Sequence, residues 1–190
     1  MPYVVAIAGP NGAGKSTIAE TFLHDLLKVR EYVNADTIAR GLSQFEPEAV
    51  AIQAGRQNLL RLEELAGTGE SFAFETTLSG RAYVARIRRW KEMGYRFLLF
   101  FFWLPDVNLA VERVAKRVRS GGHSIPEDVI RTRHRRGIEN FLDLYRNLAE
   151  AWVLYDNSGH RPRPVAFGTV GREVIMEDKS WQTFLKNTRK

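Results

Sequence analysis

The chain has 190 residues, of which 44% are hydrophobic and 26% are charged, and its formal net charge is +6. This composition is ordinary for a globular protein, so we expect one domain over residues 1–190. The absence of cysteine excludes a disulfide scaffold and a thiolate zinc site, and it fits a reducing compartment. The longest apolar run, residues 97–104, is too short to cross a membrane as a helix, and the first residues lack the basic stretch of a signal peptide. We therefore expect a cytoplasmic protein with no membrane partner.

The predicted elements alternate between strands and helices from the first residues. The apolar run at 3–8 predicts a buried strand, and residues 15–27 predict a helix with one apolar face. Residues 31–36 predict a short second strand that ends at Asp36. A long helix is expected from about residue 48 to 65, with Ile52 among its apolar positions.

The second half of the chain continues the alternation and ends differently. Residues 95–105 are apolar at nearly every position, which predicts a central strand covered on both faces. Ser124 and Glu127 form an S-x-x-E pattern, and we expect them to cap a helix with Pro126 in its first turn. The tail predicts a hairpin that turns at Gly171. The other expected elements are a strand at 71–76, helices at 81–94, 106–119 and 124 to about 150, a strand at 152–158 and a short C-terminal helix.

The segment GPNGAGKST, residues 9–17, lies between the first predicted strand and the first predicted helix. It fills the pattern G-x-x-x-x-G-K-[ST], in which glycine-rich backbone surrounds phosphate oxygens, the lysine reaches the terminal phosphates and the hydroxyl ligates Mg²⁺. A helix that opens directly after such a loop places its N-terminus under the phosphates. We therefore predict a site for ATP or GTP with Mg²⁺ held by Ser16. Its expected nucleotide-binding residues are Gly9, Pro10, Asn11, Gly12, Ala13, Gly14, Lys15, Ser16 and Thr17.

This alternation, with a phosphate loop after the first strand, predicts an α/β fold of the P-loop NTPase and kinase type. The expected architecture is a doubly wound parallel sheet with helices on both faces and a C-terminal β-hairpin. In such a sheet the carboxyl ends of the strands line the active site. Residues that directly follow strands are therefore the first candidates for chemistry.

A transporter-type ATPase is one class that writes its phosphate loop in this way. The segment TLSGR at 77–81 resembles the LSGGQ signature of those proteins, but it directly follows a predicted strand instead of opening a helix in a separate subdomain. The apolar strand at 97–104 is followed by Pro105 and Asp106, without the glutamate that would polarise an attacking water. The pattern therefore favours a small-molecule kinase.

Two carboxylates follow predicted strands. Asp36 lies where an acceptor hydroxyl would face the γ-phosphate, so we interpret it as the base that accepts the hydroxyl proton; the alternative is an N-cap of the next helix. Glu75 ends the third strand beside the phosphate loop, where it could orient substrate or hold a water of Mg²⁺. The alternative for Glu75 is a capped strand end, although a buried carboxylate needs a partner or a task.

Residues from about 113 to 137 carry arginines on both sides of a Gly-Gly pair, which is the layout of a mobile lid that closes over phosphates. Only some of these arginines can point inward. His123 lies at the hinge, and we interpret it as a loop histidine that caps a helix. The arginines that share helix faces are Arg113 with Arg117, and Arg131 with Arg135.

Five segments, taken in order, resemble the zeta-toxin-like P-loop kinases, specifically their short chromosomal branch. The segments are GPNGAGKST, NADTIARGLS, FAFETTLSG, GYRFLLFFFWL and RVRSGGHSIPEDVIRTRHRRGIEN, and the resemblance covers roughly residues 3–158. It implies ATP- or GTP-dependent phosphorylation of a sugar hydroxyl on UDP-N-acetylglucosamine, and it makes an antitoxin protein a candidate partner. It also implies roles for seven residues: Asp36 as base, Lys15 and Ser16 as phosphate and Mg²⁺ contacts, Glu75 and Thr77 as substrate contacts, and Arg117 and Arg133 as lid arginines. The family pattern has an aromatic residue after the second arginine, where this chain has His134.

Two other functions remain open at this point. The basic clusters at 86–91, 113–119 and 131–136 fit a nucleic-acid-end kinase or an RNA-binding NTPase, whose binding would weaken steeply with salt. Against this, no basic strand is rich in the aromatic residues that stack bases. A nucleotide-dependent switch would instead show slow hydrolysis without an acceptor, and a partner that binds one nucleotide state.

Overall fold

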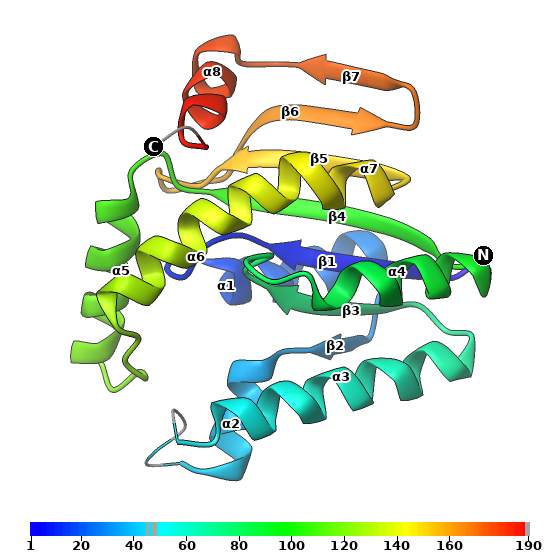
Figure 1. Cartoon of the computed structure of the whole chain (residues 1–190), viewed down its shortest axis with the longest axis horizontal. Helices are drawn as coiled ribbons and strands as arrows, with labels where there is room; N and C mark the ends of the chain where they lie inside the picture. The colour runs from blue at the N-terminus through cyan, green and yellow to red at the C-terminus, as the bar shows by residue number, and fades with distance from the viewer. Residues whose placement is uncertain (45, 47–48, 189–190) are drawn as a thin grey trace.

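The structure, a computed structural model, describes residues 1–44, 46 and 49–188. Within these residues seven strands form one sheet in the order β2-β3-β1-β4-β5-β6-β7 (Figure 1). The first five strands of this order are parallel, and β6 and β7 form an antiparallel hairpin added to the edge at β5. The strands are β1 (Tyr3–Ala8), β2 (Glu31–Val33), β3 (Phe72–Thr76), β4 (Arg96–Trp103), β5 (Ala151–Asp156), β6 (Arg163–Thr169) and β7 (Arg172–Ile175).

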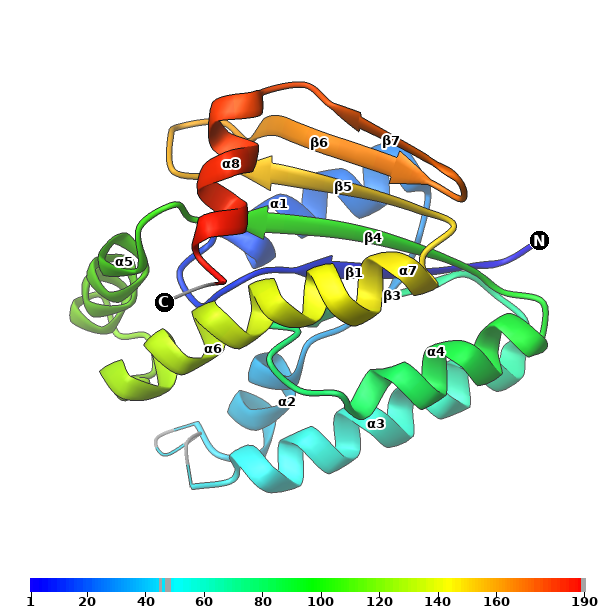
Figure 2. The ribbon, with the colours of Figure 1, turned by 45° about the horizontal axis from the view of Figure 1, so that its top comes forward.

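The helices cover both faces of the sheet, as Figure 2 shows with α3, α4 and α6 on one side and α1 on the other. The helices are α1 (Lys15–Thr21), α2 (Ala35–Leu42), α3 (Ala51–Thr68), α4 (Ala82–Glu92), α5 (Val107–Arg119), α6 (Glu127–Asn140), α7 (Arg146–Leu148) and α8 (Asp178–Lys186). A π-helical segment, Phe22–Leu27, continues α1, and a second, Phe141–Tyr145, joins α6 to α7. This arrangement confirms the predicted fold class. No helix in the described part of the chain is long and apolar enough to span a membrane.

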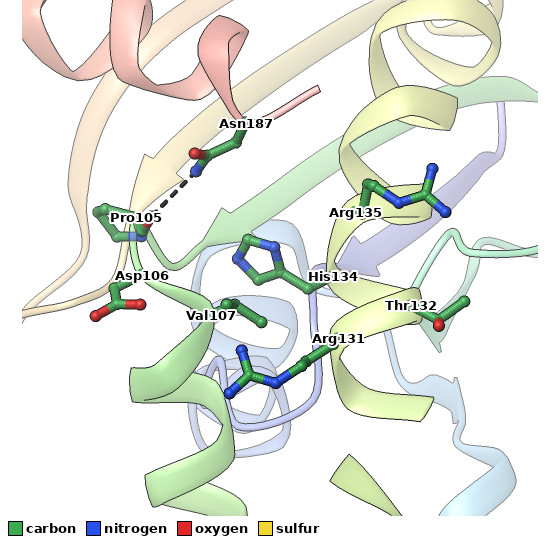
Figure 3. Close-up of a pocket in the computed structure, with 8 residues that line it drawn as sticks. All are labelled: Pro105, Asp106, Val107, Arg131, Thr132, His134, Arg135 and Asn187. Atoms are coloured by element: carbon green, nitrogen blue, oxygen red, sulfur yellow. Dashed lines mark hydrogen bonds between the residues drawn. The ribbon is translucent and has the colours of Figure 1, made fainter. Parts of the chain in front are cut away.

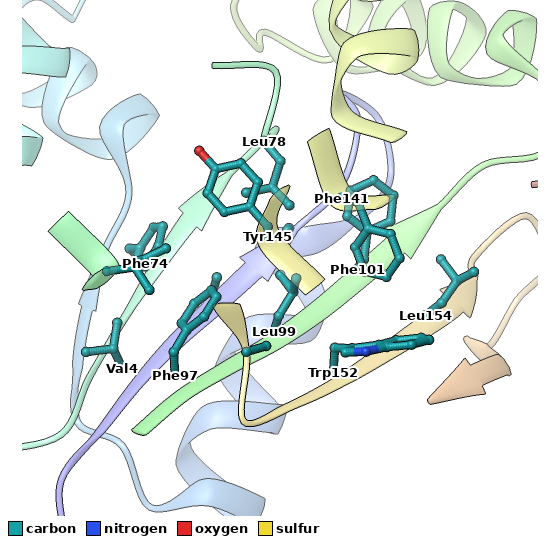
Figure 4. Packing of buried hydrophobic residues seen from close by; sticks show 14 of the residues in the cluster. Val4, Phe74, Leu78, Phe97, Leu99, Phe101, Phe141, Tyr145, Trp152 and Leu154 are labelled. Carbon is teal, nitrogen blue, oxygen red and sulfur yellow. The ribbon is translucent and has the colours of Figure 1, made fainter. Parts of the chain in front are cut away.

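Strand β4 is the central strand, and its side chains enter two separate cores. Phe97, Leu99, Phe101 and Trp103 alternate along it and pack under α3, α4, α6 and α8, while Phe102 faces α1 and α5. Because each buried side chain of this size contributes roughly 1.5–3 kcal/mol, the alternation fixes which face of β4 meets which helix layer. Figure 4 shows the larger core, with Val4, Phe74, Leu78, Phe97, Leu99, Phe101, Phe141, Tyr145, Trp152 and Leu154 labelled.

Two local predictions were wrong. Ile52 is 77% exposed, because the buried stripe of α3 runs through Ala54, Asn58 and Leu62, and a residue two positions from Ala54 lies on the opposite helix face. The expected start of that helix, Glu48, lies outside the described residues.

The expected capping box is the second error. Pro126 is the N-cap of α6 with an extended ψ of 140°, and no side chain caps the helix. The N-cap is therefore Pro126 and not Ser124, and the side chain of Glu127 forms an ion pair with Arg131. The predicted hairpin at Gly171 is confirmed by the antiparallel pairing of β6 and β7.

Helix α6 approaches the loop after β3 most closely at Gly137, which is buried. A Cβ atom at this position would lie 2.6 Å from the carbonyl oxygen of Thr77. One turn further along α6, Asn140 Nδ2 donates to the carbonyl oxygen of Leu78 at 2.7 Å. Helix α6 therefore holds the backbone at 77–78 in place.

We expect Gly137→Ala to destabilise the protein by about 1–3 kcal/mol, because a methyl group there overlaps backbone that cannot move without breaking the Asn140 bond. Gly55→Ala is the matched control: Gly55 lies inside α3 with nothing within 4 Å of its would-be Cβ. That change should stabilise the fold by about 0.5–1 kcal/mol through helix propensity. Urea unfolding of the two variants measures both changes in the free energy of unfolding. Equal changes in the two variants would contradict the proposed close contact at Gly137.

Candidate active site

The loop between β1 and α1 contains three glycines with positive φ, Gly9, Gly12 and Gly14. Gly9, at φ 142°, passes so close to the carbonyl of Phe102 that a side chain would collide with it, and Gly14, at φ 74°, begins α1. Lys15 lies across the loop, with its Nζ donating to the carbonyl oxygen of Pro10 at 3.0 Å. The result is a concave turn at a helix N-terminus, which is the geometry that binds phosphate groups.

Two residues from distant segments brace this loop. Asn157, directly after β5, donates from Nδ2 to the carbonyl oxygen of Ala13 at 2.6 Å. Arg113 of α5 donates to the carbonyl oxygens of Asn157 at 2.9 Å and Ser158 at 2.8 Å, and it lies 3.5 Å from that of Gly12. Arg113, one of the arginines of the expected lid, is therefore hydrogen-bonded to backbone carbonyls in this structure.

Glu75 lies beside the loop because β3 pairs with β1 in a register that sets Ile7 opposite Glu75. Its Oε2 accepts hydrogen bonds from Ser16 Oγ at 2.7 Å, Tyr32 OH at 2.6 Å and Asn34 Nδ2 at 2.9 Å. Its Oε1 lies 3.5 Å from Lys15 Nζ, and the two side chains are only 10% and 6% exposed. Glu75 therefore has four partners, which is more than the alternative interpretation as a capped strand end requires.

The partners decide the charge of Glu75. Burial by itself would raise the pKa of this carboxyl, but the positive charge of Lys15 and the hydrogen bonds from Tyr32 and Ser16 outweigh it and lower the pKa below its ordinary value. Burial and the neighbouring Glu75 carboxylate raise the pKa of Tyr32, so its phenol stays protonated and donates. Glu75 is therefore an ionised acceptor at neutral pH.

Asp36 lies within the first turn of α2. The prediction that the second strand reaches Asp36 is wrong, because β2 ends at Val33 and Asn34 is the N-cap of α2. The alternative that Asp36 caps the helix is wrong for the same reason: Asn34 Oδ1 accepts from the backbone N–H of Asp36 at 2.8 Å. The side chain of Asp36 is 45% exposed and lines the cavities described next.

Two cavities meet at these side chains. The larger cavity, of ≈ 520 Å³, lies between the phosphate loop and the loop that joins α5 to α6. The smaller cavity, of ≈ 210 Å³, is bounded by the backbone and side chains that follow β3. Residues that line both are Asn11, Lys15, Asn34, Asp36 and Glu75. Residues that line only the smaller one include Thr77, Ser79, Tyr83 and Arg133, and those that line only the larger one include Ser16, Thr17, Arg40, Arg113, Arg117 and His123.

The structure separates the lid arginines into two groups. Arg117 lines the larger cavity, and Arg133 lines the smaller one with its Nη1 3.4 Å from Asn11 Oδ1. Arg131 and Arg135 face a different cavity, of ≈ 490 Å³, at the start of α5 and the end of α8 (Figure 3). They form ion pairs with Glu127 and Glu139 there.

His134, next to Arg133, belongs to the fold. It is 5% exposed, and its Nε2 lies 2.8 Å from the carbonyl oxygen of Leu104. Burial lowers the pKa of this imidazole, so it is neutral and donates to that carbonyl.

The residue types also fit a magnesium ion. Ser16 Oγ and the Glu75 carboxylate are hard oxygen ligands 2.7 Å apart at the mouth of the loop. In the described residues no group of three or more His, Cys, Asp or Glu side chains could hold a metal.

Sequence reasoning missed Tyr32, Asn34 and the position of His123. A signal for the first two existed: Tyr32 lies in β2 and Asn34 follows the strand two positions later, so both side chains lie on the same side. The pairing of Val33 with Phe74 brings Asn34 level with Glu75. His123 was interpreted as a helix cap, but its Nε2 lies 3.6 Å from Asp36 Oδ2. No local pattern predicts that contact, because it joins the first turn of α2 to the α5–α6 loop, 87 positions further along the chain.

We expect Glu75→Gln to destabilise the nucleotide-free protein by about 3–5 kcal/mol at pH 7, because Lys15 loses its buried counter-charge. The folded-state pKa of Glu75 lies below its unfolded value of about 4.3, so its stabilising effect is full above that pH and is lost as the pH falls through the folded pKa. The difference in unfolding free energy between wild type and variant should therefore shrink below about pH 4. A difference that stays constant from pH 7 to pH 3 would contradict an ionised Glu75.

Comparison with known proteins agrees with this geometry. A protein-family profile described as an AAA domain matches residues 4–141. A Haemophilus influenzae protein described as uncharacterized is 32% identical over 126 residues, which cover 66% of this chain and 88% of that protein.

Several solved structures share the fold at low sequence identity. AvrRxo1-ORF1, solved in complex with AvrRxo1-ORF2 and sulphate ions, superposes with a TM-score of 0.78 at 17% identity over 99% of this chain, which spans 64% of the matched chain's length. A structure of the PezAT chromosomal toxin–antitoxin system of Streptococcus pneumoniae has a TM-score of 0.65 at 15% identity, covering 100% of this chain and 86% of the matched one. A gluconokinase from Sinorhizobium meliloti has a TM-score of 0.51 at 16% identity, with coverages of 99% and 91%. The fold is thus that of P-loop kinases, and by the profile match over residues 4–141 this chain belongs to the AAA domain family.

Proposed function

We propose that this protein is a kinase that transfers the γ-phosphoryl group of ATP to a hydroxyl group of a small molecule. The observation that carries the proposal is the meeting of two cavities at Lys15, Asp36 and Glu75. One cavity borders the phosphate loop, and the other offers a separate chamber on the far side of the same three side chains. A hydrolase needs access for water alone, whereas a phosphotransferase needs this second chamber.

The residues divide the chemistry between them. The loop backbone and Lys15 would hold the β- and γ-phosphates, and Ser16, with Glu75 through a water molecule, would hold Mg²⁺, which neutralises charge on the phosphates. Asp36 would accept the proton of the incoming hydroxyl. Arg117 would donate to the equatorial oxygens of the transferring group. The lid motion of residues from about 113 to 137 is part of this proposal.

Arg117 has an independent argument in its favour. Its Nε is buried and has no hydrogen-bond partner among the residues that the structure describes. A buried donor left unpaired is unfavourable, and a phosphate oxygen in the larger cavity would satisfy it. We therefore assign Arg117 to the phosphate side of the site. We assign Arg133, which lines the smaller cavity, to the acceptor side.

The lining of the cavities limits the acceptor. The smaller cavity presents neutral polar groups from Asn34, Thr77, Ser79 and Tyr83, which match a hydroxyl-bearing ring. An apolar pocket of ≈ 330 Å³ adjoins it at Asp36 and Arg133 and is lined by four alanines, Ile125, Pro126 and Val129. A sugar nucleotide such as UDP-N-acetylglucosamine has both a polyhydroxyl ring and further groups for the adjoining pocket. It is therefore the acceptor class that we propose first.

A protein partner is part of the proposal as well. Two of the similar structures come from systems that pair the kinase-like chain with a second protein, AvrRxo1-ORF2 in one case and an antitoxin in the other. AvrRxo1-ORF1 has also been solved with ATP, which supports ATP as the nucleotide to test. An antitoxin-like protein is the partner class we propose.

The proposed function predicts a phosphorylated acceptor. The purified protein is incubated with ATP, Mg²⁺ and a panel of hydroxyl acceptors led by UDP-N-acetylglucosamine, and masses are read for a gain of one phosphoryl group. Asp36→Asn should lower the turnover at least about a hundredfold, because it removes the base, and should leave the Kd for ATP within about threefold. ATP binding without any phosphorylated acceptor would contradict the kinase and favour a switch. Equal loss of binding and turnover in the variant would assign Asp36 to structure.

The arginine assignment has a matched control in the same segment. Arg117→Ala should lower kcat about a hundredfold or more, because it removes a donor to the transferring phosphoryl group. Arg131→Ala should leave kcat within about twofold, since Arg131 faces the outer cavity of Figure 3 and pairs with Glu127. Steady-state kinetics with the acceptor found in the screen measure both. A similar loss in both variants would mean that the arginines act through the stability of α5 and α6.

A further inference from the structure

His123 occupies a position that no part of the proposed chemistry uses. It follows the Gly-Gly pair between α5 and α6, and its side chain is 13% exposed. Its Nε2 lies 3.6 Å from Asp36 Oδ2 and 3.3 Å from Arg117 Nη2. One imidazole nitrogen therefore lies between the proposed base and the proposed phosphate ligand.

The chain reaches this position because two glycines allow a tight reversal after α5. Gly121 has a φ of +85°, and the N–H of Gly122 donates to the carbonyl oxygen of Arg117 at 2.9 Å. A Cβ atom on Gly122 would lie 2.6 Å from Arg117 Cγ, so only glycine lets the loop fold against the arginine stem. The reversal returns residue 123 over the arginine that lies six positions earlier.

His123 Nε2 can take two hydrogen-bonding roles between Arg117 and Asp36, and they differ in how well they suit these neighbours. If Nε2 accepts from Arg117, its lone pair also faces the carboxylate of Asp36, which is unfavourable. If Nε2 carries the proton, it donates toward Asp36, and Arg117 Nη2 still has the carbonyl oxygen of His123 at 3.3 Å as an acceptor. The second arrangement pairs Nε2 with the Asp36 carboxylate and Arg117 Nη2 with a carbonyl oxygen.

The Asp36 side chain contacts the α5–α6 loop through His123. In the part of the chain that the structure describes, His123 is the ion-pair partner of the Asp36 side chain. Glu75 has four partners. The half-exposed Asp36 has its backbone N–H bonded to Asn34, and its carboxylate is contacted by His123 of the α5–α6 loop. His123 also lines both the larger cavity and the apolar pocket, as Asp36 does, so the pair forms the boundary between them.

We propose that His123 is a positioning residue: it holds the Asp36 carboxylate toward the acceptor hydroxyl and couples that orientation to closure of the α5–α6 segment over the phosphates. The proposal rests on the proposed function of Asp36 as a base. The imidazole touches neither phosphate nor acceptor in this role. Through His123 the orientation of Asp36 depends on the α5–α6 segment. Asp36 is therefore aligned to accept a proton only when Arg117 is also in position.

His123→Ala should lower kcat about tenfold or more and leave the KM for ATP within about threefold. His123→Gln, whose amide N–H reaches a similar point, should recover most of that loss. Full activity in the alanine variant would overturn the proposal. A loss that glutamine does not recover would also overturn it, because a donor at this position would then not be what matters.

A spectroscopic readout tests the contact without any acceptor. Histidine is the side chain that ordinarily changes charge between pH 5 and 8. The other charged groups that border the same cavities are Lys15, Asp36, Arg40, Glu75, Arg113, Arg117 and Arg133. The ¹³C carboxyl signal of Asp36, assigned by comparison with Asp36→Asn, should therefore show an inflection in this pH range in wild type and none in His123→Gln. A flat signal in wild type would overturn the contact. Should wild type phosphorylate no acceptor, the proposed function fails, while this titration still decides whether His123 holds Asp36.

Discussion

The buried carboxylate of Glu75 is the interaction on which the rest of the site depends. Burying an ionised carboxylate without partners would destabilise the fold by several kcal/mol. Here the positive charge of Lys15 and three hydrogen bonds compensate for that burial. Those partners come from the start of α1 and from the end of β2, so one side chain fixes three segments that are far apart in the sequence. Asn34 extends the arrangement: its Nδ2 bonds Glu75, and its Oδ1 caps the helix at Asp36. The position of the proposed base therefore follows from the carboxylate beside the phosphate loop.

Helix α6 supplies the opposite wall. The contact of Gly137 with Thr77, and the hydrogen bonds from Asn140 to Leu78 and from Tyr145 to Gly80, hold the loop after β3 in a conformation with a φ of +54° at Leu78. One turn before Gly137, Arg133 reaches the smaller cavity. His134 meanwhile fastens the helix to the end of β4 through the carbonyl of Leu104. Helix α6 and the π-helical segment after it thus join the aromatic core to both the acceptor side and the phosphate side of the site.

The elements that the sequence predicted well are those set by local periodicity. The apolar run of β4, the strand–loop–helix at the phosphate loop and the hairpin at Gly171 each contain their own signal, and the structure agrees with them. The failures involve competition between neighbours. Ser124 and Glu127 have the right spacing for a capping box, but the extended Pro126 between them moves the helix start. Asp36 looked like a strand end, but Asn34, two positions earlier, is the better cap and begins the helix first. The partners of Glu75 needed the register of three strands, which no local pattern contains.

The basic character of the chain is also explained by where its charges lie. In the cluster at 86–91, Arg86 and Arg89 share Glu63, and Lys91 pairs with Glu150. In the cluster at 131–136, Arg131 and Arg135 pair with glutamates one turn away on α6. These pairs reduce the positive charge that two of the three basic clusters could offer to a nucleic-acid backbone. The cations that line the two cavities are Lys15, Arg40, Arg113, Arg117 and Arg133. Of these, Lys15 and Arg117 are the ones that we propose for the transferring phosphoryl group. The distribution of charge, more than its total, therefore favours a small-molecule phosphotransferase over a nucleic-acid-binding NTPase.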